Sequence, residues 1–434
     1  MTTQQQRQQR QRPPGPIKFR SALRNTILEV LANRKDWVET EHETDWDFFW
    51  ADKGWIHNEL DKIHLHDWQR INHFPNHGEL TRKDLLIKNL KRAKRQLERE
   101  DRAAEAAQYN FFPMTFVVPS EYRMFVEEFK NSGGTWIMKP IGQAQGRGIF
   151  LFNKLSQISE WRNKNPGEKP LNDEEAPETY LAQRYVDLPY LIGSKKFDLR
   201  IYALVTSYSP LRVYLYRSGF ARFTNTRYST KKEDIGNVHM HLTNVAIQKN
   251  APGFDKSIGM KWSIHSLRNY LLARHGGEAT NELFHGIQSL IMRCLLAVQP
   301  AMINDRHSFE LYGYDVLIDQ DLKPWIIEVN ASPSLSASDK ADWALKTAML
   351  EDMLDVLDLE GKRDPGKVEL RVGGFDLIWD GGPALRFDRP TSLPTMLGAF
   401  NERDKNQLRA YKETGPPGQE PPKHKALRSK TDTV

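Results

Sequence analysis

The sequence of 434 residues predicts a mixed α/β fold of the α+β kind, in which antiparallel strands and separate helices share the chain. Three strand-like apolar runs follow one another within residues 179–217. A further pair, at 312–319 and 325–329, indicates a hairpin because turn-forming residues separate the two runs. Apolar stripes with helical spacing occupy residues 263–275 and 278–298. A chain of this length is long enough for two or three packed subdomains.

The N-terminal part has its own composition. Residues 1–16 are rich in Gln, Arg and Pro, so we expect them to be disordered. We expect a helix over residues 21–33 and a small α/β lobe over residues 36–80, which contain five tryptophans. A further helix is predicted over residues 81–102, with Thr81 as its N-cap residue.

The middle and end of the chain carry four further signals. Residues 135–152 predict a strand, a glycine loop and a second strand. The polar, Pro-containing stretch 163–178 predicts a mobile surface loop. A helix is expected near 341–357. From about residue 400 the chain is rich in Pro, Gly and Lys, and we expect it to be disordered.

Composition narrows the class of protein. Apolar residues make up 39% of the chain, which is enough for a folded core. The single cysteine, Cys294, lies in a helical apolar stripe and is predicted to be a core residue, so no disulfide framework can form. No stretch is apolar enough to span a bilayer, and the N-terminus lacks a signal-peptide core. We therefore expect a soluble protein of the cytoplasm, without a membrane partner.

The net charge of +6 is unevenly distributed. Residues 1–20 hold five Lys or Arg and no acid, and residues 82–102 hold nine Lys or Arg against four acids. Such patches favour an acidic partner. No zinc-finger, RNP or helix-turn-helix signature supports nucleic acid, and a negatively charged protein tail fits equally well. A solvated helical face is the alternative for 82–102.

The segment KPWIIEVNASPS, residues 323–334, predicts a metal site. Glu328 and Asn330 interrupt an apolar strand two residues apart, so they share one face. Burying two such groups is costly without a partner, and a hard cation such as Mg²⁺ prefers oxygen ligands. The alternative is a strand end that hydrogen-bonds to a neighbouring loop.

The preceding strand supplies a third oxygen ligand. Depending on where the turn is centred, Asp315 lies directly opposite Glu328 or diagonal to it on the same face. Either register brings Asp315, Glu328 and Asn330 together, which is how proteins usually hold Mg²⁺.

Two more segments indicate phosphate contacts. Lys139 ends an apolar strand, and a glycine-rich loop, residues 142–148, follows it. The loop matches neither a P-loop nor a GxGxxG fingerprint, so it predicts either a lid over phosphates or an ordinary hairpin. Lys196, Asp198 and Arg200 share one strand face, a pattern that suits phosphate and Mg²⁺ contacts and also suits a solvent-exposed edge strand.

The pair His239 and His241 resembles a zinc-binding pair, but the surrounding sequence does not support zinc binding. His239 and His241 are spaced like a zinc pair, but no third His or Cys ligand lies nearby in the sequence. We therefore expect no zinc at this position. The residues that follow, HLTN at 241–244, offer polar groups instead.

The motifs WIMKP, AQGRGIF, LIGSKKFDLR, HLTN, ELYGYD and WIIEVNASPS occur in an order that resembles the tubulin tyrosine ligase-like family, whose fold is the ATP-grasp. The segment INHFPNHGELTRKDLLIKNLKR at 71–92 resembles the N-terminal lobe of that family. The resemblance implies a catalytic domain over residues 21–395 that encloses ATP. Its lobes would be N-terminal (21–132), central (133–205) and C-terminal (206–395), between basic and disordered tails at 1–20 and 396–434.

The resemblance also implies roles for individual residues. ATP would be bound by Lys139, Gln145, Gly146, Gln183, Arg184, Tyr185, Val186, Lys196, Phe197, Asp198, Thr243 and Asn244. Gln183 to Val186 would hold the adenine, and Arg200 would face the phosphates. Asp315, Glu328 and Asn330 would bind Mg²⁺. Arg222 and Lys261 would grip the carboxylates of an incoming amino acid, and the implied catalytic residues are Arg200, Arg222, Lys261 and Glu328.

The implied activity is that of an ATP-dependent tubulin polyglutamylase. It would join free glutamate to glutamate side chains of tubulin C-terminal tails on microtubules, through an acyl phosphate. Accessory subunits are possible partners, and the implied location is the cytoskeleton, including the axoneme and basal body of cilia and flagella. The alternatives are a tubulin glycylase, a catalytically silent axonemal component with the same fold, and a ligase for small molecules.

Overall fold

The computed structural model describes six stretches of the chain, with residues 12–143, 145–158, 179–251, 261–364, 366–384 and 394–401. The expected surface loop at 163–178 and most of both expected tails lie outside the described residues. Within these stretches, no helix combines the length and apolarity needed to cross a membrane.

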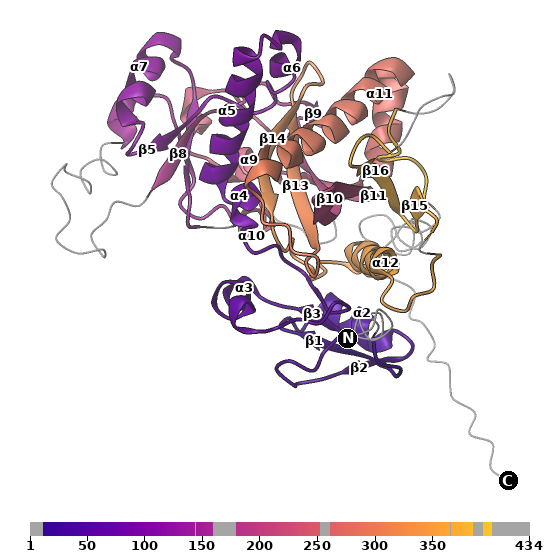
Figure 1. The fold of residues 1–434 in the computed structure, drawn as a ribbon. Helices are drawn as coiled ribbons and strands as arrows, with labels where there is room; N and C mark the ends of the chain where they lie inside the picture. Colours follow the sequence, from indigo (N-terminus) through magenta and orange to yellow (C-terminus); the bar gives the residue numbers. More distant parts are fainter. Residues whose placement is uncertain are drawn as a thin grey trace.

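An eight-stranded sheet forms the centre of the molecule (Figure 1). Its main path has the order β14-β13-β10-β11-β16-β15, with β12 paired to β11 and β9 paired to β10, and all of these pairings are antiparallel. The strands are β9 (Leu191–Ile192), β10 (Lys195–Tyr208), β11 (Leu211–Phe223), β12 (Lys261–Ser263), β13 (Glu310–Ile318), β14 (Pro324–Asn330), β15 (Arg371–Val372) and β16 (Phe375–Asp380).

Helices cover both faces of this sheet and connect the smaller sheets. They are α2 (Thr26–Asn33), α3 (Lys53–Asn58), α4 (Gly78–Thr81), α5 (Lys83–Arg99), α6 (Ala103–Ala107), α7 (Tyr122–Ser132), α9 (Val238–His241), α10 (Val245–Gln248), α11 (Ile264–Val298) and α12 (Lys340–Leu357).

Strand β10 shows how the two faces differ. Leu199 and Ile201 point into a core shared with α5 and α11. Tyr202 and Leu204 point the other way, into a core shared with α2, α12 and the N-terminal sheet. Side chains alternate between faces along a strand, so Lys196, Asp198 and Arg200 lie on the second face.

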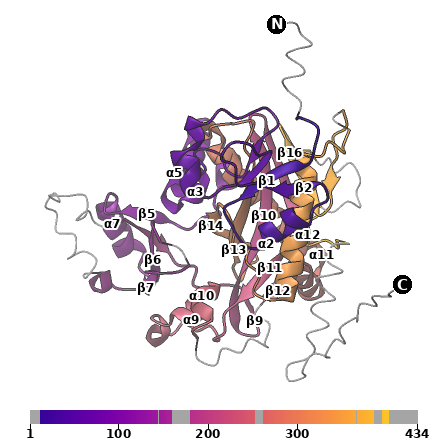
Figure 2. The same cartoon turned by 90° about the horizontal axis from the view of Figure 1, so that it is seen from below.

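A second, four-stranded antiparallel sheet has the order β5-β8-β6-β7, with β5 (Thr115–Val118), β6 (Trp136–Pro140), β7 (Phe150–Phe152) and β8 (Tyr180–Arg184). Helix α7 covers one face through Phe125, which packs on Trp136 and Phe152. Figure 2 shows this sheet at one side of the main sheet, with α9 and α10 at the junction. The strand–loop–strand prediction for residues 135–152 is confirmed.

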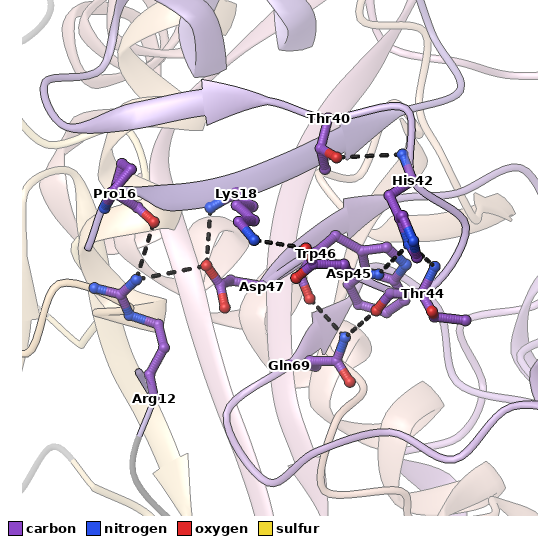
Figure 3. Close-up of polar contacts among 10 residues, drawn as sticks. All are labelled: Arg12, Pro16, Lys18, Thr40, His42, Thr44, Asp45, Trp46, Asp47 and Gln69. Carbon is purple, nitrogen blue, oxygen red and sulfur yellow. Dashed lines mark hydrogen bonds and ion pairs between the residues drawn. The ribbon is translucent and has the colours of Figure 1, made fainter. Parts of the chain in front are cut away.

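The N-terminal sheet is parallel, with the order β2-β1-β3-β4, formed by β1 (Ile17–Ser21), β2 (Trp37–Glu39), β3 (Phe48–Trp50) and β4 (Arg70–Ile71). Side chains from its loops hold the strands together (Figure 3). The Asp47 carboxylate accepts a 2.8 Å bond from the Lys18 amide and lies 3.5 Å from Arg12. Gln69 donates to the Trp46 carbonyl at 2.5 Å.

The N-terminal predictions need correction. Residues Ile17–Ser21 form β1, so the ordered chain begins before the expected end of the tail at residue 20. Helix α2 begins at Thr26 and not at residue 21, because the Asn25 side chain accepts a hydrogen bond from Ile27 and caps the helix there. Helix α5 begins at Lys83; Thr81 ends α4, and its hydroxyl donates to a carbonyl of the preceding turn.

The C-terminal half follows the predictions more closely. The two helices expected over 263–298 meet at Gly276, whose φ of 79° breaks the helical path of α11. The helix expected near 341–357 is α12. The expected lobe boundary after residue 205 falls inside β10. Leu397 is buried in the core, so the ordered chain continues past the expected start of the tail at 396.

Candidate active site

A cleft between the two antiparallel sheets collects most of the residues selected from the sequence. The predicted residues that line it are Lys139, Gln145, Gly146, Gln183, Arg184, Tyr185, Val186, Lys196, Asp198, Arg222, Thr243, Asn244, Asp315 and Glu328. They come from β6, the loop after it, β8, β10, β11, β13, β14 and the segment between α9 and α10. Separate parts of the chain therefore converge on one cavity.

Neighbouring strands carry charged residues at matching positions. Arg200 of β10 pairs with Asp315 of β13, and Asp315 pairs with Glu328 of β14. On the other side of β10, Asp198 pairs with Arg222 of β11. The charged residues Lys196, Asp198 and Arg200 are buried, and β10 lies between β11 and β13. The edge-strand interpretation of this segment is therefore wrong.

Two arginines and two aspartates form one buried ionic network. Arg200 binds both oxygens of Asp315, at 2.5 Å from Nε and 3.0 Å from Nη2. Arg222 Nε lies 2.9 Å from Asp198 Oδ1, its Nη2 binds Asp198 Oδ2, and the same Nη2 lies 2.8 Å from Asp315 Oδ2. Burial opposes the ionisation of Asp315, but the two guanidinium groups outweigh it and hold its pKa below the ordinary value.

Two lysines are buried without such partners. Lys139 Nζ donates to the Gln183 carboxamide at 2.6 Å. Lys196 Nζ donates to the Tyr185 hydroxyl and to the His241 carbonyl, both at 2.9 Å. Burial lowers the pKa of Lys139 to about 8, and burial and the charge of Lys139 lower the pKa of Lys196 to about 7. A bound anion would therefore stabilise the charged form of both lysines.

The glycine loop after β6 turns sharply next to these lysines. Gln145 and Gly146 both have positive φ, of 63° and 80°. The φ of Gly146 favours glycine, and a Cβ there would lie 2.4 Å from the Ile247 side chain and 3.1 Å from the Asn244 side chain, so a larger residue would also have to displace Ile247. The loop therefore approaches the Thr243–Asn244 segment closely, at the mouth of the cleft.

The predicted metal-binding residues lie together on the hairpin. Asp315 stands directly opposite Glu328, which is the first of the two predicted registers, and a bulge follows at Val316. The Asn330 amide lies 3.5 Å from Glu328 Oε1 and 3.4 Å from the Gly313 carbonyl. Asp315 differs from the other two residues because both of its oxygens are already bound by arginine.

Lys83 is a site residue that sequence reasoning missed. It opens α5, lines the cleft, and its Nζ lies 3.1 Å from Glu328 Oε2. The basic composition of residues 82–102 predicted only a surface patch. The first residue of that helix instead reaches the predicted metal ligand, and only the tertiary structure brings the two together.

Four predicted residues lie outside the cleft lining: Lys261, Arg200, Phe197 and Asn330. Lys261 of β12 pairs with Arg222 in the sheet, but its Nζ bonds Ser338 at 2.7 Å and Asp342 at 3.1 Å. Arg200 reaches the site through Asp315. The Phe197 side chain lies in the core on the opposite face of β10.

His241, near the cleft, has partners other than a metal. His241 Nδ1 lies 3.0 Å from the Tyr185 hydroxyl, and its Nε2 lies 3.1 Å from the Asp234 carbonyl. Burial and the charge of Lys196 lower the pKa of His241 to about 4. The imidazole is therefore neutral at physiological pH and supports Tyr185.

Comparison with known proteins gives one consistent family. Residues 61–364 match the model of the tubulin-tyrosine ligase family. The chain is 48% identical over 427 residues to a mouse protein described as probable tubulin polyglutamylase TTLL9, covering 91% of this chain and 92% of the mouse protein.

Two further relatives come from distant organisms. The probable tubulin polyglutamylase ttll-9 of Caenorhabditis elegans is 46% identical over 364 residues, covering 83% of this chain and 84% of the relative. The probable alpha-tubulin polyglutamylase Ttll1 of Tetrahymena thermophila is 41% identical over 385 residues, covering 84% and 93%. The expected mixed α/β fold of the ATP-grasp type is confirmed, and the chain belongs to the tubulin-tyrosine ligase family.

Proposed function

We propose that this chain is an ATP-dependent tubulin polyglutamylase, which joins free glutamate to glutamate side chains in the C-terminal tails of tubulin. The observation that carries the proposal is the cleft, where two buried lysines without carboxylate partners face an ordered row of arginines and acids. Relatives that share more than four-fifths of the chain and are named as polyglutamylases support the choice of reaction.

The residues of the cleft fit a nucleotide. Lys139 and Lys196 are buried cations that need an anion, and the loop at Gln145 and Gly146 lies beside them. Strand β8 ends at Arg184, and Tyr185 and Val186 follow it in the lining of the cleft. We assign the phosphates to the lysine side and the adenine to Gln183 through Val186.

The hairpin residues fit Mg²⁺. Glu328 is partly exposed to the cleft and is held by one lysine, and the Asn330 side chain lies next to it. Oxygen ligands from a carboxylate and a carboxamide suit this cation, with water and phosphate completing its shell. Asp315 would contribute through the lone pairs that Arg200 and Arg222 leave free.

Bound Mg²⁺ and ATP would supply the γ-phosphoryl group that converts a glutamate side chain of tubulin into an acyl phosphate. The amine of free glutamate then displaces phosphate, forming an isopeptide bond. Within the protein, Lys139, Lys196 and Lys83 offset the growing negative charge. Arg222 of β11 and Lys261 of β12 are register partners, and we assign to them the carboxylates of the incoming amino acid, which would compete with their present partners Asp198, Asp315 and Asp342.

The surface of α5 suits an acidic partner. Lys88, Arg92, Arg95 and Arg99 are exposed and follow one another at three- and four-residue steps, so they form a stripe along one side of the helix. The stripe begins one turn beyond Lys83, which lines the cleft. We assign it to the glutamate-rich tubulin tail, and we place the enzyme on microtubules of axonemes and basal bodies.

Mass spectrometry of tubulin tails tests the proposal. The protein is incubated with tubulin, ATP, Mg²⁺ and labelled glutamate or labelled glycine, with and without a ciliary extract as a source of accessory subunits. We expect glutamate to be incorporated. Incorporation of glycine alone would make the protein a glycylase, and no incorporation in either condition would leave a non-catalytic protein of the same fold.

A further inference from the structure

Outside the cleft, His73, His77 and Glu310 form a buried cluster at the junction of the N-terminal lobe and the main sheet. One ligand atom from each lies within 4.8 Å of the other two. The exposed fractions are 1% for His73, 4% for His77 and 0% for Glu310. Across the described ranges, no other trio of histidine, cysteine or acidic residues meets this distance criterion.

Outer contacts orient each of the three side chains. His73 Nε2 lies 3.0 Å from the Ser332 hydroxyl, and its Nδ1 lies 2.8 Å from Glu310 Oε1. His77 Nδ1 lies 3.2 Å from the Phe74 carbonyl, which leaves its Nε2 available. Histidine ligands of metals characteristically use the second ring nitrogen in this way, to bind a backbone carbonyl or another polar group.

The two carboxylate oxygens of Glu310 also have different partners. Its Oε2 accepts hydrogen bonds from the Tyr312 hydroxyl at 2.9 Å and from the Phe74 amide at 3.3 Å. Its Oε1 faces His73. One nitrogen of each histidine and one oxygen of the glutamate therefore lie within 4.8 Å of one another, and the other nitrogen or oxygen of each side chain has a separate hydrogen-bond partner.

We propose that His73, His77 and Glu310 form a zinc site, distinct from the Mg²⁺ assigned to the cleft. Two imidazoles and one carboxylate are a ligand set that zinc accepts, and the three-residue gap in His73-Phe-Pro-Asn-His77 is a usual spacing for paired histidine ligands. Zinc needs a fourth ligand, which is water or His57, whose ring centroid lies 5.5 Å from that of His77.

The place of the site in the fold indicates what the ion does. His73 and His77 follow β4 of the N-terminal sheet, whereas Glu310 opens β13 of the main sheet. Ser332, which orients His73, lies two residues after Asn330. A bound ion would therefore fasten the N-terminal lobe to the main sheet, next to the loop that follows the predicted Mg²⁺ ligands.

Metal analysis of the full, untagged chain tests this proposal. After equilibration with zinc and removal of excess metal, we expect about one zinc ion per chain. His77→Gln and Glu310→Gln should each lower zinc affinity by more than about 10-fold. The matched control is His64→Gln, because His64 is exposed in the same lobe and should leave zinc binding unchanged.

Two measurements on the unaltered chain do not depend on the variants folding. Cobalt in place of zinc should give the visible absorption of a four-coordinate ion, and zinc should raise the melting temperature after treatment with a chelator. Substoichiometric zinc, an octahedral cobalt spectrum, or equal zinc binding by the His77→Gln chain would overturn the proposal. Because these readouts require no tubulin, they are independent of the polyglutamylase assay.

Discussion

The cleft buries two arginines and two lysines, and their surroundings differ. Arg200 and Arg222 each bind carboxylates of the protein at hydrogen-bond distance. Lys139 and Lys196 are met only by neutral groups: a carboxamide, a hydroxyl and a backbone carbonyl. A buried charge needs compensation, and the two arginines have carboxylate partners within the protein, whereas the two lysines have none at hydrogen-bond distance. For this reason we assign the phosphates to the lysines.

The largest expected effect comes from removing the carboxylate that both arginines share. Asp315→Asn leaves Arg200 and Arg222 short of a buried counter-charge, which should lower the free energy of unfolding by about 3–5 kcal/mol. Lys196→Met removes a buried amine that has no ionic partner and should not lower it. Chemical denaturation of both variants measures the contrast, and equal losses would show that the lysine is already compensated.

The Mg²⁺ assignment predicts a loss of rate without a loss of fold. Glu328→Gln should reduce glutamate incorporation by about 10²–10³-fold, because the carboxylate would hold the Mg²⁺ that offsets negative charge on the reacting phosphate. Because Glu328 is partly exposed, the melting temperature of the Glu328→Gln variant should stay close to that of the unaltered chain. Asp321→Asn, in the exposed turn of the same hairpin, is the control. Full activity of the Glu328→Gln chain would show that Glu328 is not a ligand of Mg²⁺.

Local patterns predicted much of this arrangement. The alternation in KKFDLR placed Lys196 and Asp198 on one face, and hairpin geometry placed Asp315 opposite Glu328. Both inferences use contacts that are short in sequence, or a strand period that does not depend on the rest of the fold. The family resemblance then supplied the remaining positions.

The rest required the tertiary structure. No local pattern shows that β10 lies inside the sheet, where its charged face must be compensated and not solvated. Lys83 meets Glu328, and His73 meets Glu310 across 237 residues, only because the N-terminal lobe packs on the main sheet. Nothing in the spacing of these residues distinguishes them from surface residues of the same type.

A variant of Lys83 tests whether this third lysine contacts phosphate together with the buried Lys139 and Lys196. Its ion pair with Glu328 is partly exposed, so Lys83→Met should change stability by less than about 1 kcal/mol. If Lys83 contacts phosphate once Mg²⁺ binds Glu328, the same variant should lower activity about 10-fold, mainly by raising the KM for ATP. Lys130→Met, on the exposed side of α7, should have neither effect. An unchanged KM for ATP would show that Lys83 does not contact phosphate and only forms the ion pair with Glu328.

Proton uptake on ATP binding is the smallest expected effect, and it tests the contrast between the buried lysines and the buried arginines most directly. In the empty cleft the pKa of Lys196 is about 7 and that of Lys139 about 8, so at pH 8 both amines are partly neutral. A bound triphosphate raises both values, and ATP binding at pH 8 should therefore take up on the order of one proton, most of it on Lys196. Calorimetric titrations at pH 8 in buffers of different ionisation enthalpy measure this uptake. Lys196→Met should reduce it, and at pH 6, where both amines are already charged, it should vanish.

The same values fix the sign of the pH dependence of stability without nucleotide. A lysine whose pKa is lowered by folding binds fewer protons in the folded chain than in the unfolded chain. The contribution of Lys196 to the free energy of unfolding should therefore rise as pH increases from about 7 toward the ordinary value of 10.5. Lys196→Met should flatten that rise, and saturating ATP should do the same. Arg200 and Arg222 stay charged throughout this range, so a rise that survives both changes would have to come from another group.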